Sequence, residues 1–131
     1  MAFWGTMKIL IADDEVGLGR LFKIMFSDKM PDSQVDVVIS GVEAEDLFRN
    51  SNYDVVLLDV SMHEKNGYDV CVEIQGICRE RNSKMPFIIF YSGYGASEEI
   101  ELLLEDKSGY AFLRKPVTSA QIMAAIEEIQ K

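Results

Sequence analysis

The sequence predicts an α/β fold in which a doubly wound, five-stranded parallel β-sheet carries helices on both faces. Two observations predict this class: five short apolar runs alternate with five segments of helical periodicity, and the apolar runs are nearly continuous. Strict alternation implies right-handed crossovers between parallel strands, and continuous apolar runs are typical of strands covered on both faces. The 131 residues suffice for one domain, since a chain of this length buries roughly two thirds of its unfolded surface.

The domain is predicted to begin after a short irregular segment. Residues 1–6 (MAFWGT) fit no periodic pattern, so we interpret them as a tail or a cloning remnant and place the domain at residues 7–131. Residues 7–12 (MKILIA) form an apolar run typical of a buried strand, and apolar side chains recur at helical spacing over residues 18–26. Residues 34–39 (QVDVVI) are short and β-branched, which favours a second strand.

The middle of the chain contains the strand that we expect at the centre of the sheet. A serine-glycine pair separates the second strand from a short helix over residues 42–48. Residues 54–59 (DVVLLD) are apolar between two acids, as in a strand buried on both faces. Residues 67–82 then show helical periodicity, and Asn66 is suited to cap the amino end of that helix.

The remaining part of the chain repeats the alternation twice. Residues 87–91 (FIIFY) form an apolar strand that ends at a serine-glycine pair, and residues 98–106 form a helix with acidic outer positions. Residues 110–113 form a short strand closed by a lysine-proline pair, and residues 119–130 form the last helix.

Charge and composition argue against several functions. The formal charge of −9, from 22 acidic and 13 basic residues, repels phosphate backbones, so we expect no direct binding of nucleic acid. No apolar run approaches the roughly 20 residues of a membrane span, and no charged leader precedes an apolar segment. Cys71 and Cys78 have no further Cys or His at ligand spacing, which argues against a zinc site or a disulfide framework. We expect a soluble, cytoplasmic protein.

Polar side chains stand at the carboxyl ends of the predicted strands. Asp13 and Asp14 follow the first strand, and Asp59 ends the third. Ser92 follows the fourth strand, and Lys115 follows the fifth. Each of these is singly a common cap or turn residue, but ligand sites of doubly wound sheets form outside these strand ends. We therefore expect three carboxylates, one hydroxyl and one ammonium at one edge of the sheet.

This set of groups favours phosphoryl chemistry with a metal ion. Three adjacent carboxylates repel one another, and a hard divalent cation offsets the repulsion. Mg²⁺ fits best, with Asp14 and Asp59 as direct ligands and Asp13 acting through water, because it also takes waters and a phosphate oxygen. Lys115 and Ser92 would contact the phosphoryl group. With no His or Cys at these strand ends, Asp59 is the predicted nucleophile and would form an aspartyl phosphate.

Four segments together resemble a known family. They are DDE at residues 13–15, LLDVSMHEKNG at 57–67, YSG at 91–93 and RKP at 114–116. Through these segments, residues 7–131 resemble the receiver domains of two-component response regulators. The chemotaxis response regulator is one member of that family. The resemblance implies a flavodoxin-like fold with the strand order 2-1-3-4-5.

The resemblance also implies a function and its partners. A sensor histidine kinase or a phosphotransfer protein would supply a phosphoryl group to Asp59 in a Mg²⁺-dependent reaction, and a downstream effector or output domain would respond. In the family pattern Ser92 is the switch hydroxyl, and Lys115 is the lysine of the site. The backbone carbonyl of Ser61 is a metal ligand, and the bond from Lys115 to Pro116 is a cis peptide. The domain is then a phospho-accepting signalling module with self-catalysed transfer and dephosphorylation, and two copies could pair.

Three residues depart from the family pattern without removing a phosphorylation residue. His63 stands where proline is usual, and Phe112, the expected switch aromatic, stands where tyrosine is commoner. Tyr94 is a bulky residue two positions after Ser92. Because Tyr94 is broad enough to cover the site and exclude water, we expect a long-lived phosphoform.

Two other functions are weighed against this one. A Mg²⁺-dependent aspartyl-phosphate phosphatase uses similar chemistry and is the main alternative, but it needs a second Asp two residues after the nucleophile, where this chain has Ser61. A flavodoxin-like FMN carrier needs a Ser-, Thr- or Gly-rich phosphate loop after the first strand. Here Asp13, Asp14 and Glu15 would repel the phosphate.

Overall fold

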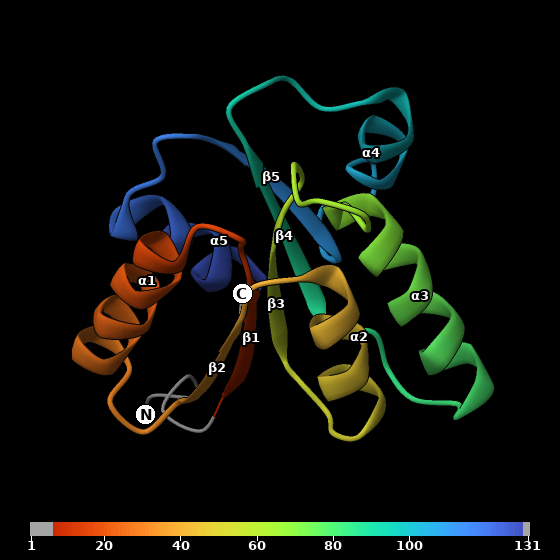
Figure 1. Cartoon of the computed structure of the whole chain (residues 1–131), viewed down its shortest axis with the longest axis horizontal. Coiled ribbons are helices and arrows are strands. Elements are labelled where there is room, and N and C mark those ends of the chain that lie inside the picture. Colours follow the sequence, from red (N-terminus) through yellow and green to blue (C-terminus); the bar gives the residue numbers. More distant parts are fainter. Residues whose placement is uncertain (1–6, 130–131) are drawn as a thin grey trace.

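The fold is a five-stranded parallel sheet with the order β2-β1-β3-β4-β5, seen in a computed structural model that describes residues 7–129 (Figure 1). The strands are β1 (Lys8–Ala12), β2 (Gln34–Val38), β3 (Val55–Asp59), β4 (Phe87–Ser92) and β5 (Tyr110–Arg114). The helices are α1 (Val16–Lys29), α2 (Gly41–Arg49), α3 (Gly67–Glu80), α4 (Glu98–Leu103) and α5 (Ser119–Ile129). The predicted fold class and strand order are confirmed. The expectations for residues 1–6 and for residue 130 lie outside the described residues.

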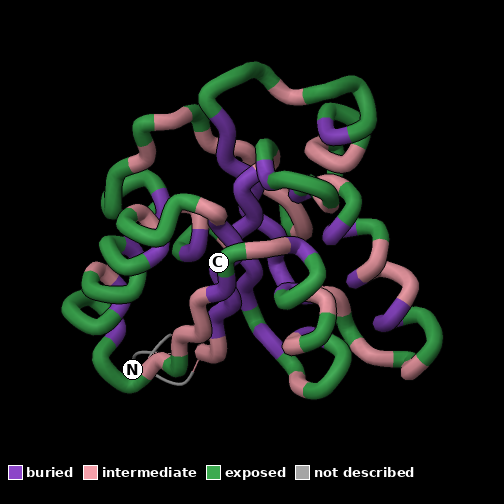
Figure 2. The backbone as a smooth tube through the Cα atoms, viewed as in Figure 1, coloured by how far each residue is buried: buried purple, intermediate pink, exposed green. Residues whose placement is uncertain are grey.

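Helices cover both faces of the sheet, as the continuous apolar strands predict. α1 and α5 lie against one face, and α2, α3 and α4 lie against the other (Figure 1). In β3, Val55 and Leu57 pack on the side of α1 and α5, while Val56 and Leu58 pack on the opposite side. All residues of β3 and β4 are buried, and Figure 2 shows them at the centre of the molecule. The central strand is therefore the one that the sequence predicts.

The helix α4 is shorter than predicted. Its apolar spacing indicated a helix to residue 106, but α4 ends at Leu103. Its last turn carries no basic residue, and Glu105 and Asp106 follow at the end where the helix dipole disfavours negative charge. The Asp106 carboxylate instead accepts hydrogen bonds from the backbone N–H and the hydroxyl of Ser108. Local electrostatics thus end the helix before its apolar pattern does.

The amino end of α3 agrees with the prediction and fixes the loop after β3. The Asn66 side chain accepts a hydrogen bond from the Asp69 N–H, and the Asp69 carboxylate accepts one from the Asn66 N–H. Farther along α3, Cys71 and Cys78 are buried free thiols, as expected for core residues. Burial raises the pKa of the Cys71 thiol to about 12. In the part of the chain from residue 7 to 129, no helix is long and apolar enough to cross a membrane.

Candidate functional site

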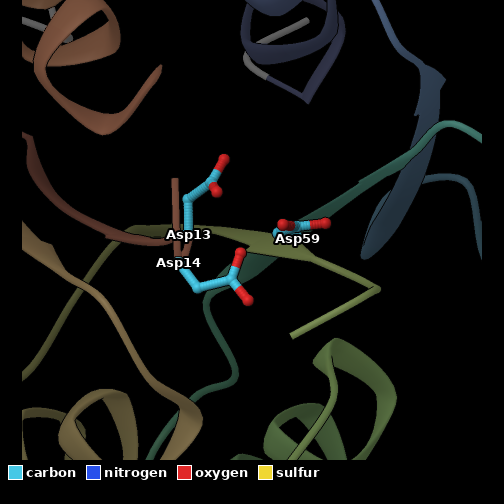
Figure 3. Close-up of side chains that lie close together, drawn as sticks. All are labelled: Asp13, Asp14 and Asp59. Carbon is cyan, nitrogen blue, oxygen red and sulfur yellow. The ribbon is translucent and has the colours of Figure 1, made fainter. Parts of the chain in front are cut away.

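The carboxyl ends of β1 and β3 bring three carboxylates together (Figure 3). Asp13 and Asp14 directly follow β1, and Asp59 is the last residue of β3. Because β1 and β3 pair in parallel, their carboxyl ends reach the same edge of the sheet. Ligand oxygens of the three side chains all lie within 4.8 Å of one another. The three acids that the sequence places at strand ends therefore form one cluster.

Asp59 lies between a backbone amide and an ammonium group. Its side chain is only 2% exposed, and its Oδ1 lies 3.3 Å from the Nζ of Lys115. The same Oδ1 accepts a hydrogen bond of 3.1 Å from the N–H of Ser61. A Cβ atom at Gly67 would lie 2.8 Å from the carbonyl oxygen of Asp59, so only glycine lets α3 begin this close to the strand end. Backbone packing and charge together fix this carboxylate.

Lys115 brings a positive charge to the acidic cluster from the loop after β5. Its peptide bond to Pro116 is cis, as the resemblance implies, and its N–H donates to the carbonyl oxygen of Ser92 at 2.8 Å. Its Nζ also lies 3.4 Å from an Oε1 of Glu15. Partial burial disfavours the charged ammonium, but the facing carboxylates, Asp59 first among them, outweigh it and raise the pKa of Lys115. Lys115 is therefore charged at neutral pH.

Asp13 is completely buried, and each of its oxygens has its own donor. Oδ1 accepts from the N–H of Glu15 at 2.8 Å, and Oδ2 accepts from the hydroxyl of Tyr91 at 2.8 Å. Burial raises the pKa of Asp13 to about 6, and the nearby Asp59 carboxylate acts in the same direction, although both hydrogen bonds oppose it. A cation beside this group would favour its charged form. The cluster has the composition of a site for a metal ion.

The remaining predicted residues lie around this cluster. Ser92 is 2% exposed, and its Oγ accepts a hydrogen bond of 3.0 Å from the N–H of Tyr94. Ser61 is exposed in the loop after β3. Phe112 is half-buried in β5 and packs against the core beneath α3 and α4. The Tyr94 side chain is 76% exposed and packs little against its surroundings, so its geometry gives no support to the shielding role expected from the sequence.

The acidic cluster lies apart from a cavity of the described chain. A cavity of about 550 Å³ lies at the amino ends of β3, β4 and β5, where Asp54, Phe87 and Gly109 contribute to its lining. The carboxylate cluster lies at the opposite ends of these strands. We take the carboxylates as the candidate functional site, because three acids gather there at the carboxyl edge of the sheet, where ligand sites of doubly wound folds form.

Two contacts of the site could not be predicted from the sequence. The first joins the Tyr91 hydroxyl to Asp13. Its only sequence signal is a tyrosine inside a strand that is otherwise apolar, because a buried tyrosine hydroxyl needs a partner. The second joins Glu15 to Lys115 across 100 positions of the chain, and nothing local to Glu15 indicates which cation it meets.

Comparison with known proteins agrees with this geometry. The family model described as response regulator receiver domain matches residues 9–127. A protein named probable transcriptional regulator ycf27, from Guillardia theta, is 30% identical over 122 residues, which are 93% of this chain and 44% of that protein. Response regulator MprA of Mycobacterium sp. (strain KMS) is 26% identical over 123 residues, which are 94% of this chain and 50% of that protein. The chain thus spans about half the length of these curated relatives.

Solved structures show the same fold over nearly the whole chain. The receiver domain of the Francisella response regulator 1452 superposes with a TM-score of 0.74 at 25% identity, covering 95% of this chain and 96% of that one. The Vibrio cholerae chemotaxis protein CheY4 superposes with a TM-score of 0.75 at 18% identity, covering 95% and 98%. The second likeness concerns the fold alone. The family match extends over most of the chain, so this protein belongs to the response regulator receiver domain family of two-component signalling.

Proposed function

We propose that this domain is a phospho-accepting switch in which Asp59 receives a phosphoryl group from the phosphohistidine of a sensor histidine kinase or a phosphotransfer protein. The observation that carries the proposal is the pairing of the buried Asp59 carboxylate with Lys115 at 3.3 Å, beside Asp13 and Asp14. A carboxylate fixed next to an ammonium is suited to meet an incoming phosphoryl group, because the ammonium offsets the negative charge of the phosphoryl oxygens.

The side chain of Asp59 is the nucleophile of this transfer. A carboxylate oxygen attacks phosphorus, the bond between phosphorus and the donor imidazole nitrogen breaks, and the electron pair of that bond returns to the imidazole. The contacts from Ser61 and Lys115 both fall on Oδ1 of Asp59, so we assign the attack to Oδ2. The product is an aspartyl phosphate whose phosphoryl oxygens Lys115 would contact.

We propose Mg²⁺ as the cofactor of this site. Asp14 and Asp59 would bind it directly, Asp13 would bind it through a water, and the backbone carbonyl of Ser61 would add a further ligand. The cluster consists of oxygen donors, which suit a hard divalent cation. When bound, the ion would neutralise the acidic cluster and the phosphoryl oxygens.

The phosphorylated state would be transmitted through Ser92 and Phe112. The buried Ser92 hydroxyl can turn to donate to a new phosphoryl oxygen, and Phe112, half-buried in the neighbouring β5, would move into the space that this frees. The surface of α4, β5 and α5 would then present its altered form to an effector, to an output domain or to a second copy of this chain. The curated relatives, whose names include transcriptional and response regulators, are about twice as long as the matched region, which supports an attached output domain.

A phosphatase acting on a separate substrate is less well supported. Such an enzyme needs a general acid two residues after the nucleophile, and the hydroxyl of Ser61 has no carboxyl proton to give. Asp59 and Lys115 suit the acceptance of a phosphoryl group, whereas Ser61 does not suit the general-acid role that rapid turnover of a separate substrate would need.

Phosphorylation in vitro tests the proposal. We expect the wild-type chain to gain one phosphoryl group from acetyl phosphate in Mg²⁺, as measured by intact-protein mass, and to gain none in EDTA. Asp59→Asn should gain none in either buffer. The control Asp28→Asn changes an acid that is 74% exposed on α1, and it should behave as the wild type. Equal uptake by Asp59→Asn, or uptake that ignores EDTA, would contradict the mechanism.

A further inference from the structure

A buried tyrosine contacts the acidic cluster from inside the core. Tyr91 is 1% exposed and lies in β4, where it pairs with Asp59 of β3. Its hydroxyl donates to Oδ2 of Asp13 at 2.8 Å, and the Nζ of Lys115 lies 5.4 Å from the centre of its ring. One side chain thus touches an acid of the cluster and the lysine that faces it.

The position of this hydroxyl is fixed by packing. The ring of Tyr91 meets the ring of Phe22 from α1 edge to face, with centroids 5.5 Å apart and planes at 90°. The carbonyl oxygen of Tyr91 accepts a hydrogen bond of 3.0 Å from the N–H of Val60, the residue after Asp59. Because the ring and the backbone are both held, the hydroxyl has little freedom to follow Asp13, and it is the carboxylate that must adopt a fixed orientation.

The hydrogen bond from Tyr91 completes the restraint on Asp13. The N–H of Glu15 already holds Oδ1, so a free Oδ2 would leave the carboxylate able to rotate about its last bond. With Tyr91 on Oδ2, both oxygens have donors, and their remaining lone pairs point in set directions. Groups that hydrogen-bond a metal ligand from outside commonly change metal affinity about 10- to 100-fold, because they orient the ligand in advance.

We propose that Tyr91 is a positioning residue of the metal site: its hydroxyl holds the Asp13 carboxylate in the orientation that binds a water molecule of the ion. The inference rests on the proposed function, since it concerns the same acidic cluster. Tyr91 would thus belong to the site through its effect on Mg²⁺ affinity, without contacting the phosphoryl group.

Mg²⁺ titration of two matched variants tests the inference. Tyr91→Phe keeps the ring that packs on Phe22 and removes only the hydroxyl. Tyr53→Phe is the control. The Tyr53 side chain is also buried, and its hydroxyl donates a hydrogen bond of 2.6 Å to the carboxylate of Asp36, which is not part of the acidic cluster. By calorimetry we expect Tyr91→Phe to bind Mg²⁺ about tenfold more weakly than the wild type. Tyr53→Phe should match the wild type.

A spectroscopic measurement on the wild type keeps the test independent of the variants' stability. With ¹³C at the Cζ of tyrosine, the Tyr91 resonance should shift during the Mg²⁺ titration with the midpoint found by calorimetry, and the Tyr53 resonance should stay in place. The role of Tyr91 would be overturned by a Tyr91 resonance that does not shift, by an unchanged Mg²⁺ affinity in Tyr91→Phe, or by an equal loss of Mg²⁺ affinity in both variants. A wild type that binds no Mg²⁺ at all would instead overturn the proposed cofactor.

Discussion

Lys115 and Asp59 form a close ion pair at the carboxyl edge of the sheet, with Nζ 3.3 Å from Oδ1, although one residue follows β5 and the other ends β3. The same Nζ lies 3.4 Å from Glu15, so a single ammonium serves two carboxylates in this state. An incoming phosphoryl group would compete with both for that charge. Phosphorylation of Asp59 would therefore require Lys115 to exchange part of its contact with these carboxylates for a contact with the phosphoryl oxygens.

Replacing this ammonium should slow phosphorylation more than it affects metal binding. We expect Lys115→Met to lower the rate of phosphorylation by acetyl phosphate about a hundredfold, because one charged donor to the phosphoryl oxygens is lost. Mg²⁺ affinity should stay the same or rise, since a positive charge leaves the cluster. Lys107→Met, at an exposed position before β5, is the control. A rate within threefold of the wild type would remove Lys115 from the mechanism.

The acidic cluster should cost the protein stability when no cation is present. We expect Asp14→Asn to raise the free energy of unfolding by about 1 kcal/mol in EDTA, because one of three mutually repelling carboxylates becomes neutral. Mg²⁺ should stabilise the wild type and leave Asp14→Asn nearly unchanged. Urea unfolding with and without Mg²⁺ measures both effects, with Asp32→Asn, an exposed acid before β2, as the control. A destabilised Asp14→Asn in EDTA would contradict the repulsion.

Two glycines of α3 should respond in opposite ways to alanine. A Cβ at Gly67 would lie 2.8 Å from the Asp59 carbonyl oxygen, so Gly67→Ala must displace the strand end and should cost about 1–3 kcal/mol. A Cβ at Gly76 meets nothing within 4 Å, so Gly76→Ala should stabilise α3 by about 0.5–1 kcal/mol. Urea unfolding compares the two, and phosphorylation should be slowed only in Gly67→Ala. Equal stabilities of the two variants would contradict the close approach.

The coupling through Ser92 can be separated from phosphorylation itself. We expect Ser92→Ala to accept a beryllofluoride mimic at Asp59 but to lose most of the amide chemical-shift changes in β5 and α4 that the wild type shows. The reason is that only the hydroxyl can exchange its contact with the Tyr94 N–H for a bond to the mimic. Ser108→Ala, in the turn before β5, is the control. Identical shift changes in wild type and Ser92→Ala would refute the coupling.

An ion pair that anchors the loop after β3 should make stability depend on pH. Lys65 in this loop pairs with Glu45 of α2, which Arg49 also contacts, while Glu73 and Asp69 of α3 face the same lysine. The hydrogen bond from Lys65 outweighs burial and holds the pKa of Glu45 below its ordinary 4.5. A lowered pKa in the folded state means that the stabilisation is present above pH 4.5 and is lost as the pH falls through the folded value.

The variant Glu45→Gln measures this contribution. At pH 6 we expect it to be less stable than the wild type by on the order of 1 kcal/mol, because the pair is only partly screened by solvent. The difference should shrink as the pH falls through the lowered pKa of Glu45, because the wild-type carboxylate then becomes neutral like the Gln side chain. Urea unfolding at several pH values decides the matter, and a difference that stays constant with pH would show that Glu45 acts by packing alone.

The alternation of strands and helices could be predicted from the sequence alone, because the spacing of apolar residues is a local property that follows the repeat of the strand or helix backbone. The acidic cluster was predictable for a related reason. Once β1 and β3 are assigned as parallel strands, their carboxyl ends must share one edge, and Asp13, Asp14 and Asp59 follow from that geometry alone. At the end of α4, where local charge opposes the apolar pattern, the predicted helix was longer than the observed one.

The side chains that meet across the sheet could not be identified without the three-dimensional structure. The hydrogen bond from Tyr91 to Asp13 and the shared contact of Lys115 with Glu15 depend on strand register and on loop paths that bring distant residues within a few ångströms. Likewise, the need for glycine at position 67 arises from how closely α3 approaches the end of β3. Such contacts carry no periodic signal in the chain, because their partners are chosen by packing in three dimensions rather than by neighbours in sequence.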